Sequence, residues 1–262
     1  MTKPAPSVQL WSIREPFMED MNAALARLSE IGFTQVEPFA HGDLKAGTFV
    51  DDLAAALKAN DLVSPTVHMQ VIGKDATQYF EAAQKLGVTY LIDPMHAPAD
   101  WRDPIGIPPM WQDKDALHKI ADNLNDLSVQ AKQYGLKVGY HNHAFELSAR
   151  VDGEIALQYL INHLNDDVVI ELDTYWCEAG GVSAPEFLKK NRNRVVALHI
   201  KDGNRNGNVD EQVPAGKGEL PIPEILAAAS HAIPVIEFDK YTSGEIFEGV
   251  TTALAYVNQV RG

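Results

Sequence analysis

The feature that most constrains this chain is an alternation of short β-rich runs with longer helical patterns, repeated eight times along the sequence. Several of the helical patterns stop at a glycine, as at Gly32, Gly87 and Gly135, which is a common way for a helix to end. Parallel strands joined by helical crossovers form a single sheet, and eight such units close naturally into a barrel. The predicted strands span residues 7–11, 34–38, 62–69, 88–92, 137–142, 168–173, 194–200 and 233–238, and the predicted helices span 18–31, 49–60, 75–86, 113–134, 154–164, 184–191, 223–230 and 245–260.

The pattern therefore predicts an α/β fold, a (β/α)8 TIM barrel that forms a single domain over residues 1–262. The structural alternative is an open doubly wound sheet. Two features argue against it: no G-x-G-x-x-G follows the first strand, and polar residues finish most of the strands. A long proline-rich segment, residues 93–109, carries Trp101 and is predicted to be a functional loop.

Composition excludes several classes of protein. The formal net charge is −14, which argues against a protein that binds a nucleic-acid backbone. Cys177 is the single cysteine, so the chain cannot form an internal disulfide. No apolar stretch approaches the roughly 20 residues of a membrane helix, and the first residues lack the apolar run of a signal peptide. We therefore expect a soluble, cytoplasmic protein with a small-molecule substrate and no membrane partner; barrels of this kind often pair, so a homo-oligomer is possible.

Polar side chains collect at the carboxyl ends of the predicted strands, which is where the active site of a barrel lies. Closure of the barrel brings the ends of the last four strands together around one axis. Two imidazoles and two carboxylates can then face a common point, a mixed donor set that suits Mn²⁺, Co²⁺, Fe²⁺ or Zn²⁺, with Mg²⁺ possible. The predicted ligands of one divalent metal ion are His141, Asp173, His199 and Glu237.

Five short motifs carry a resemblance to a known family. They are VQLWS at 8–12, VEP at 36–38, GYHNHAFE at 139–146, ELD at 171–173 and LHIKD at 198–202. Together they resemble the xylose isomerase-like barrel superfamily, and more narrowly its sugar phosphate isomerase/epimerase members. The resemblance covers the whole chain. It implies a metal held by residues of strands five to eight, carried over here as Asp173, His199 and Glu237.

The chain departs from that pattern at two places. The strand-five ligand is a glutamate in related 3-epimerases, whereas Tyr140 or His141 fills the matching place here; we choose His141, because tyrosine is the poorer ligand. Trp176 stands where a histidine would follow the aspartate of strand six, so direct transfer of epimerase substrate contacts is in doubt. Arg205 matches a substrate-binding arginine of the epimerases.

The metal site predicts chemistry on a hydroxy-ketone, whose α-C–H becomes acidic when the oxygens are polarised. Return of the proton to the opposite face gives an epimer, and return to the neighbouring carbon gives an isomer. We predict that Glu146, placed within reach of solvent, His143 and Glu237 perform the acid/base steps. The predicted substrate-binding residues are Glu37, His68, Trp176, Lys201 and Arg205; Lys201 could instead pair with Asp202, and Trp11, Phe39, Trp101 and Trp176 could form an aromatic pocket wall.

The expected function is thus a divalent-metal-dependent isomerase or epimerase of a small sugar or sugar derivative, acting through an enediolate. The alternative is a metal-dependent lyase or dehydratase on keto-inositols or 3-keto-glycosides, which would share that intermediate. A nuclease of the endonuclease IV type would need further histidines and a basic face, against which Trp176 and the net charge of −14 argue. A non-enzymatic barrel remains a further alternative and predicts that no metal is bound.

Overall fold

Eight parallel strands form one sheet in the order β2-β1-β10-β9-β8-β5-β4-β3 in the computed structural model, which describes residues 3–39, 48–94 and 106–262. Isolated bridges between Gln35 and Val63 and between Phe39 and His68 join β2 to β3, so the sheet closes on itself. The predicted TIM barrel is confirmed, and the open sheet is excluded. The strands are β1 (Ser7–Gln9), β2 (Gln35–Glu37), β3 (Thr66–His68), β4 (Tyr90–Asp93), β5 (Lys137–His141), β8 (Val169–Asp173), β9 (Val195–Ile200) and β10 (Ile233–Ile236).

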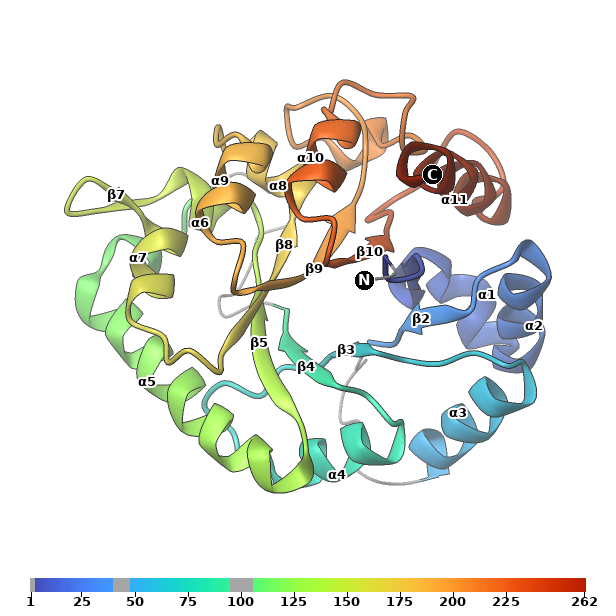
Figure 1. Ribbon diagram of the computed structural model, residues 1–262, viewed down its shortest axis with the longest axis horizontal. Coiled ribbons are helices and arrows are strands. Elements are labelled where there is room, and N and C mark those ends of the chain that lie inside the picture. The colour runs from blue at the N-terminus through green and yellow to red at the C-terminus, as the bar shows by residue number, and fades with distance from the viewer. Residues whose placement is uncertain (1–2, 40–47, 95–105) are drawn as a thin grey trace.

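The long helices form a ring outside the strands (Figure 1). Each turns an apolar face inward, and aliphatic side chains such as Leu28, Leu124 and Leu254 are buried between helix and sheet. All eight predicted helices are present, with ends that differ by a few residues. The ring consists of α2 (Met21–Ile31), α3 (Thr48–Ala59), α4 (Thr77–Lys85), α5 (Lys114–Ala131), α7 (Ala156–Asn162), α9 (Ala184–Lys190), α10 (Ile222–Ala228) and α11 (Ile246–Arg261).

Local turn chemistry produces several short elements that periodicity did not predict. The first helical pattern is split into α1 (Arg14–Glu19) and α2, because the side chain of Asp20 accepts a hydrogen bond from Ala23 N and starts a new helix. A 3-10 turn, η1 (Leu10–Ile13), shortens β1. Two short helices follow strand ends, α6 (Ala144–Ser148) and α8 (Thr174–Ala179), and a small hairpin pairs β6 (Arg150–Val151) with β7 (Glu154–Ile155).

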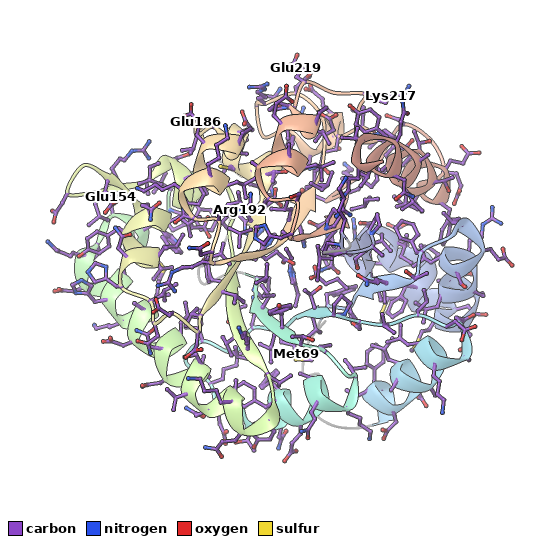
Figure 2. All side chains as sticks on the ribbon, viewed as in Figure 1. Met69, Glu154, Glu186, Arg192, Lys217 and Glu219 are labelled. Carbon is purple, nitrogen blue, oxygen red and sulfur yellow. The ribbon has the colours of Figure 1, made fainter. Side chains whose placement is uncertain are left out.

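The centre of the ring is filled by side chains, whereas charged residues such as Glu154, Glu186 and Glu219 lie at the periphery (Figure 2). Many of the side chains that fill the barrel near the carboxyl ends of the strands are polar and nevertheless buried, including those of Gln9, Glu37 and Glu171. Trp101 and the middle of the predicted functional loop lie outside the described residues. Among the helices that the structure describes, none is both long and apolar enough to cross a membrane.

Candidate metal centre

The register of the sheet determines which strand-end side chains meet. Gln9 pairs with Glu37, His141 with Glu171, and Asp173 with His199. Paired residues of adjacent parallel strands direct their side chains to the same face, and successive residues of one strand alternate between faces. The interior of the barrel therefore holds stacked layers of polar side chains at its carboxyl end.

The outer cluster consists of Asp173, His199 and Glu237. All three side chains are buried, and each offers a ligand atom within 4.8 Å of the other two. The Nδ1 atom of His199 lies 2.5 Å from Oε2 of Glu237. The structure thus brings together three of the four predicted metal ligands, from the ends of β8, β9 and β10.

The strand-five residue that faces this cluster is His141. Its Nε2 atom lies 3.7 Å from Oδ2 of Asp173. Tyr140 lies on the opposite face of β5, where its ring packs 5.9 Å from that of Trp111 and its hydroxyl donates to Oε1 of Glu146 over 2.8 Å. Of the two residues considered from the sequence, His141 is the one that points into the barrel.

Below the outer cluster lies an inner cluster made of Glu37, His68, His141, Glu171 and His199. The Oε2 atom of Glu171 lies 2.5 Å from His68 Nε2, 3.2 Å from His141 Nδ1 and 3.2 Å from His199 Nε2. Glu37 Oε1 lies 2.8 Å from His199 Nε2. One carboxylate oxygen is therefore shared by three imidazoles, and His199 connects the inner cluster to the outer one.

Glu171 belongs to the ELD motif at 171–173 but is not among the site residues predicted from the sequence. The available signal was the two-residue spacing of Glu171 and Asp173, which places both side chains on the inner face of one strand. Glu37 and His68 were predicted to contact substrate hydroxyls. Glu37 is instead fully buried between Gln9 and the histidines, and His68 is 7% exposed. Direct substrate contact by Glu37 is therefore not supported.

The charges of the inner cluster follow from burial and from these contacts. Burial alone would lower the pKa of His199, but the carboxylates of Glu171, Glu237 and Glu37 raise it well above its usual value. Burial would raise the pKa of Glu171, yet His199 and His68 hold it well below its usual range. The pKa of Glu37 is raised by burial and by the neighbouring charge of Glu171. Of the two carboxyl groups of the inner cluster, Glu171 thus favours the ionised form more strongly than Glu37 does.

In the outer cluster, burial raises the pKa of Asp173 to about 6, while the charge of Lys201 opposes the shift. Burial, and then the charge of Lys201, lower the pKa of His143 to about 3, so this imidazole is neutral near pH 7.

A comparison with known protein families identifies the family of this barrel. The family described as "Xylose isomerase-like TIM barrel" matches residues 25–248. The chain belongs to the xylose isomerase-like TIM barrel family. The predicted resemblance is confirmed, and so is the expectation that the chain is an enzyme, because the family and the structural neighbours are sugar isomerases or epimerases and a related dehydratase.

Solved structures share the fold across the whole chain. A sugar phosphate isomerase/epimerase from Parabacteroides distasonis is 21% identical, with a TM-score of 0.79 over 100% of this chain and 96% of that one. An L-ribulose 3-epimerase is 12% identical, with a TM-score of 0.73 over 98% and 94%. The IolI protein with a bound zinc atom is 18% identical, with a TM-score of 0.72 over 99% and 98%. None of the curated proteins matches the chain.

The donor set of this family member fits a divalent cation. The two carboxylate oxygens of Asp173 have different partners. Oδ1 accepts a hydrogen bond from Trp176 N over 2.9 Å, and Oδ2 is directed to the cluster. Two carboxylates would nearly neutralise a divalent ion, and His199 has the carboxylates of Glu37 and Glu171 behind its other ring nitrogen. The buried cluster could therefore hold a metal.

Lys201 does not form the ion pair with Asp202 that the sequence left open as an alternative to substrate binding. Lys201 lies 2.8 Å from Asp173 Oδ2, 2.7 Å from Glu237 Oε2 and 2.8 Å from Asp239 Oδ2. Asp202 does not pair with it, because its carboxylate is occupied by four backbone N–H donors of the following loop. These donors belong to Gly203, Gly216, Gly218 and Leu220.

Trp176 and Arg205, which were also predicted to bind substrate, lie in different surroundings from each other. Trp176 is fully buried in α8, with its ring 6.2 Å from that of His143 and 5.8 Å from Lys201 Nζ, so it packs against the side chains of the site and faces no opening. Its large apolar surface explains the burial. Arg205 donates to Glu178 Oε2 over 3.0 Å and to the Glu219 carbonyl over 2.7 Å. Substrate binding by Arg205 stays a prediction.

Part of the predicted aromatic wall borders a hollow next to the strand ends. Trp11 and Phe39 pack edge to face with ring centroids 5.2 Å apart. Together with Arg14, Glu15 and Met18 they line a shallow hollow of about 350 Å³. Because Trp11 follows β1 and Phe39 follows β2, this apolar surface lies at the same end of the barrel as the candidate metal centre.

Glu146 was predicted to be within reach of solvent, and this is wrong. Its side chain is fully buried, Oε1 accepts from the Tyr140 hydroxyl over 2.8 Å, and Oε2 accepts from His143 N over 2.8 Å. The second contact belongs to a capping box at the start of α6, which explains why the carboxylate turns inward. Glu146 thus positions His143.

The pH dependence of stability tests this role. Burial raises the pKa of Glu146 to about 8 in the folded chain, against 4.5 for an unperturbed glutamate. The stability that it contributes is present below about pH 4.5 and is lost as the pH rises through about 8, a change of about 3–5 kcal/mol. Glu146→Gln is expected to remove this slope in urea denaturation at pH 5, 7 and 9. Loss of turnover in a stable Glu146→Gln variant would instead assign a catalytic role to this carboxylate.

Proposed function

We propose that this member of the family is a divalent-metal-dependent isomerase or epimerase of a small sugar or sugar derivative. The observation that carries the proposal is the convergence of Asp173, His199 and Glu237 in one buried cluster at the carboxyl ends of the strands. His141 is proposed as the fourth ligand, because it faces this cluster from β5. Mn²⁺, Co²⁺, Fe²⁺ and Zn²⁺ suit two imidazoles and two carboxylates.

The metal would polarise the oxygens of a bound hydroxy-ketone and stabilise the enediolate that follows loss of the α-proton. His143 is proposed as the base, because its ring lies 5.5 Å from that of His141 and is 9% exposed, whereas Asp173 and His199 are completely buried. Glu237, which is 6% exposed, is proposed as the second acid/base group; it would first take up a proton from solvent and then return it to the enediolate. Return to the opposite face would give an epimer, and return to the adjacent carbon an isomer.

A lyase or dehydratase is the second candidate. A probable 3-DHS dehydratase, AsbF from Bacillus anthracis, shares the fold, with 13% identity and a TM-score of 0.71 over 97% of this chain and 98% of that one. The same proton abstraction would then be followed by departure of a β-leaving group. Keto-inositols and 3-keto-glycosides are the substrates that this alternative predicts.

Metal content and solvent exchange test the proposal together. The purified protein is expected to carry about one equivalent of Mn, Co, Fe or Zn, a stoichiometry set by a single four-ligand site. Incubation with a panel of keto-sugars in D₂O is expected to place deuterium at the carbon next to the carbonyl, detected by NMR. A chelator-treated sample is the control and should regain exchange when the metal is restored.

The outcomes separate the two candidates. Deuterium in an unchanged carbon skeleton supports the isomerase or epimerase. Formation of an unsaturated product from a keto-inositol or a 3-keto-glycoside supports the lyase. A folded protein that neither retains nor rebinds any of these metals contradicts both.

A further inference from the structure

Lys201 has an unusual position immediately after β9. Its side chain is 2% exposed, which is rare for a lysine, and its ammonium lies among three carboxylates. The distances from Nζ are 2.8 Å to Asp173 Oδ2, 2.7 Å to Glu237 Oε2 and 2.9 and 2.8 Å to the two oxygens of Asp239. Two buried acids and the partly exposed Asp239, facing one another without a cation, would be costly. Lys201 therefore supplies a charge that this cluster requires.

Two of these three carboxylates belong to the proposed metal site. Glu237 Oε2, which contacts Lys201, is the same atom that lies 2.5 Å from His199 Nδ1. Asp173 Oδ2, the other contact of the ammonium, is the oxygen that its helix cap leaves available. A divalent ion bound by Asp173 and Glu237 would thus bind the same carboxylate oxygens that contact the Lys201 ammonium.

The third carboxylate is anchored independently of any metal. Asp239 Oδ2 accepts a hydrogen bond from Gln212 Nε2 over 2.7 Å, and Asp239 N donates to Gln212 Oε1 over 2.8 Å. Gln212 is fully buried. The ring of Trp176 lies 5.8 Å from the ammonium and adds an attractive face. Lys201 would consequently keep Asp239 as a fixed partner if Asp173 and Glu237 turned toward another cation.

We propose that Lys201 is a counter-cation that pairs with Asp173 and Glu237 and holds them in place in the metal-free protein. When a metal binds, these two carboxylates would bind the metal instead, and Lys201 would remain paired with Asp239. This inference rests on the proposed function, because it assumes a metal at the outer cluster. It makes Lys201 a positioning residue and gives it no direct contact with substrate. Its consequence is that the lysine and the metal compete for the same carboxylates, so that their effects on binding and stability are coupled.

Two variants are expected to shift metal affinity in opposite directions. Lys201→Met removes the competing charge and should tighten Co²⁺ binding about tenfold. Asp239→Asn leaves Lys201 with Asp173 and Glu237 as its anions and should weaken Co²⁺ binding about tenfold. The matched control is Lys240→Met, which removes the same unit of charge from a half-exposed lysine that pairs with Asp210. Its Co²⁺ affinity should remain that of the wild type.

The experiment is a Co²⁺ titration followed by visible absorption at constant pH, combined with thermal unfolding of each protein with Co²⁺ and with EDTA. The gap in Tm between loaded and metal-free protein is expected to be wider in Lys201→Met than in the wild type, because only the metal-free form depends on the lysine. An unchanged affinity with the same loss of Tm in both forms overturns the proposal and makes Lys201 an ordinary structural ion pair.

The remaining outcomes distinguish this proposal from the proposed function. Normal Co²⁺ binding by the wild type, with no opposite shifts in the variants, overturns the role of Lys201 alone. Binding by Lys201→Met but not by the wild type supports the competition. Absence of binding in both overturns the metal site and this inference together. If Lys201→Met does not fold even with Co²⁺, Asp239→Asn decides, and an unchanged affinity in that variant counts against the proposal.

Discussion

Asp173→Asn is expected to abolish metal binding and to lower turnover at least about a thousand-fold, while the chain stays folded. The reason is that the two oxygens of Asp173 have separate tasks. Oδ1 caps α8 by accepting from Trp176 N, and an asparagine carbonyl can do the same. Oδ2 lies 2.8 Å from Lys201 Nζ and is proposed to bind the metal; an amide group there offers donors, which repel a cation.

Asp173→Ala separates the cap from the metal site. It removes both oxygens, so it should lose metal binding as fully as Asp173→Asn and cost about 1 kcal/mol more in the free energy of unfolding. Elemental analysis, the deuterium-exchange assay and urea denaturation measure the three effects. Asp210→Asn, on an exposed carboxylate, is the control for the change in charge. Retention of metal and exchange by Asp173→Asn would remove Asp173 from the proposed site.

The sequence was sufficient to predict the barrel because the relevant signal is repeated. Each strand and helix pattern alone is ambiguous, but eight in alternation leave a parallel sheet with crossovers as the consistent solution. The same regularity placed Asp173, His199 and Glu237 at one end of the barrel. Their convergence follows from closure, so it needs no knowledge of side-chain contacts.

Features that depend on local turns or on register were not predictable in this way. Glu146 is turned inward by the capping box of α6, a helix too short to give a periodic signal. The position of Lys201 depends on Asp239, which lies 38 residues further along the chain. Glu171 can be assigned to the site only when the pairing of β5 with β8 is known, because this pairing places His141 beside it. Sequence spacing gives the face of a strand but not the partner across it.

The last prediction concerns Glu171, whose replacement by glutamine is expected to lower the free energy of unfolding by about 3–5 kcal/mol and to weaken metal binding about 10–100-fold. Oε2 of Glu171 is shared by His68, His141 and His199, within 2.5–3.2 Å of their ring nitrogens. Removal of its charge leaves buried imidazolium groups with too few anions. It also loosens His199 and His141, both of which are proposed metal ligands.

Glu37→Gln provides the matched control, because Glu37 lies in the same cluster and is equally buried. Burial and the charge of Glu171 raise the pKa of Glu37, so the neutral glutamine is expected to be tolerated better here than at position 171. Its Oε1 accepts from Gln9 over 2.7 Å, and an amide oxygen can replace that acceptor. Glu37→Gln should therefore cost less than about 1 kcal/mol in urea denaturation at pH 7. A greater loss in Glu37→Gln than in Glu171→Gln would place the charge of the inner cluster on Glu37. Equal losses would show that Glu171 has no special part in organising the histidines of the candidate metal centre.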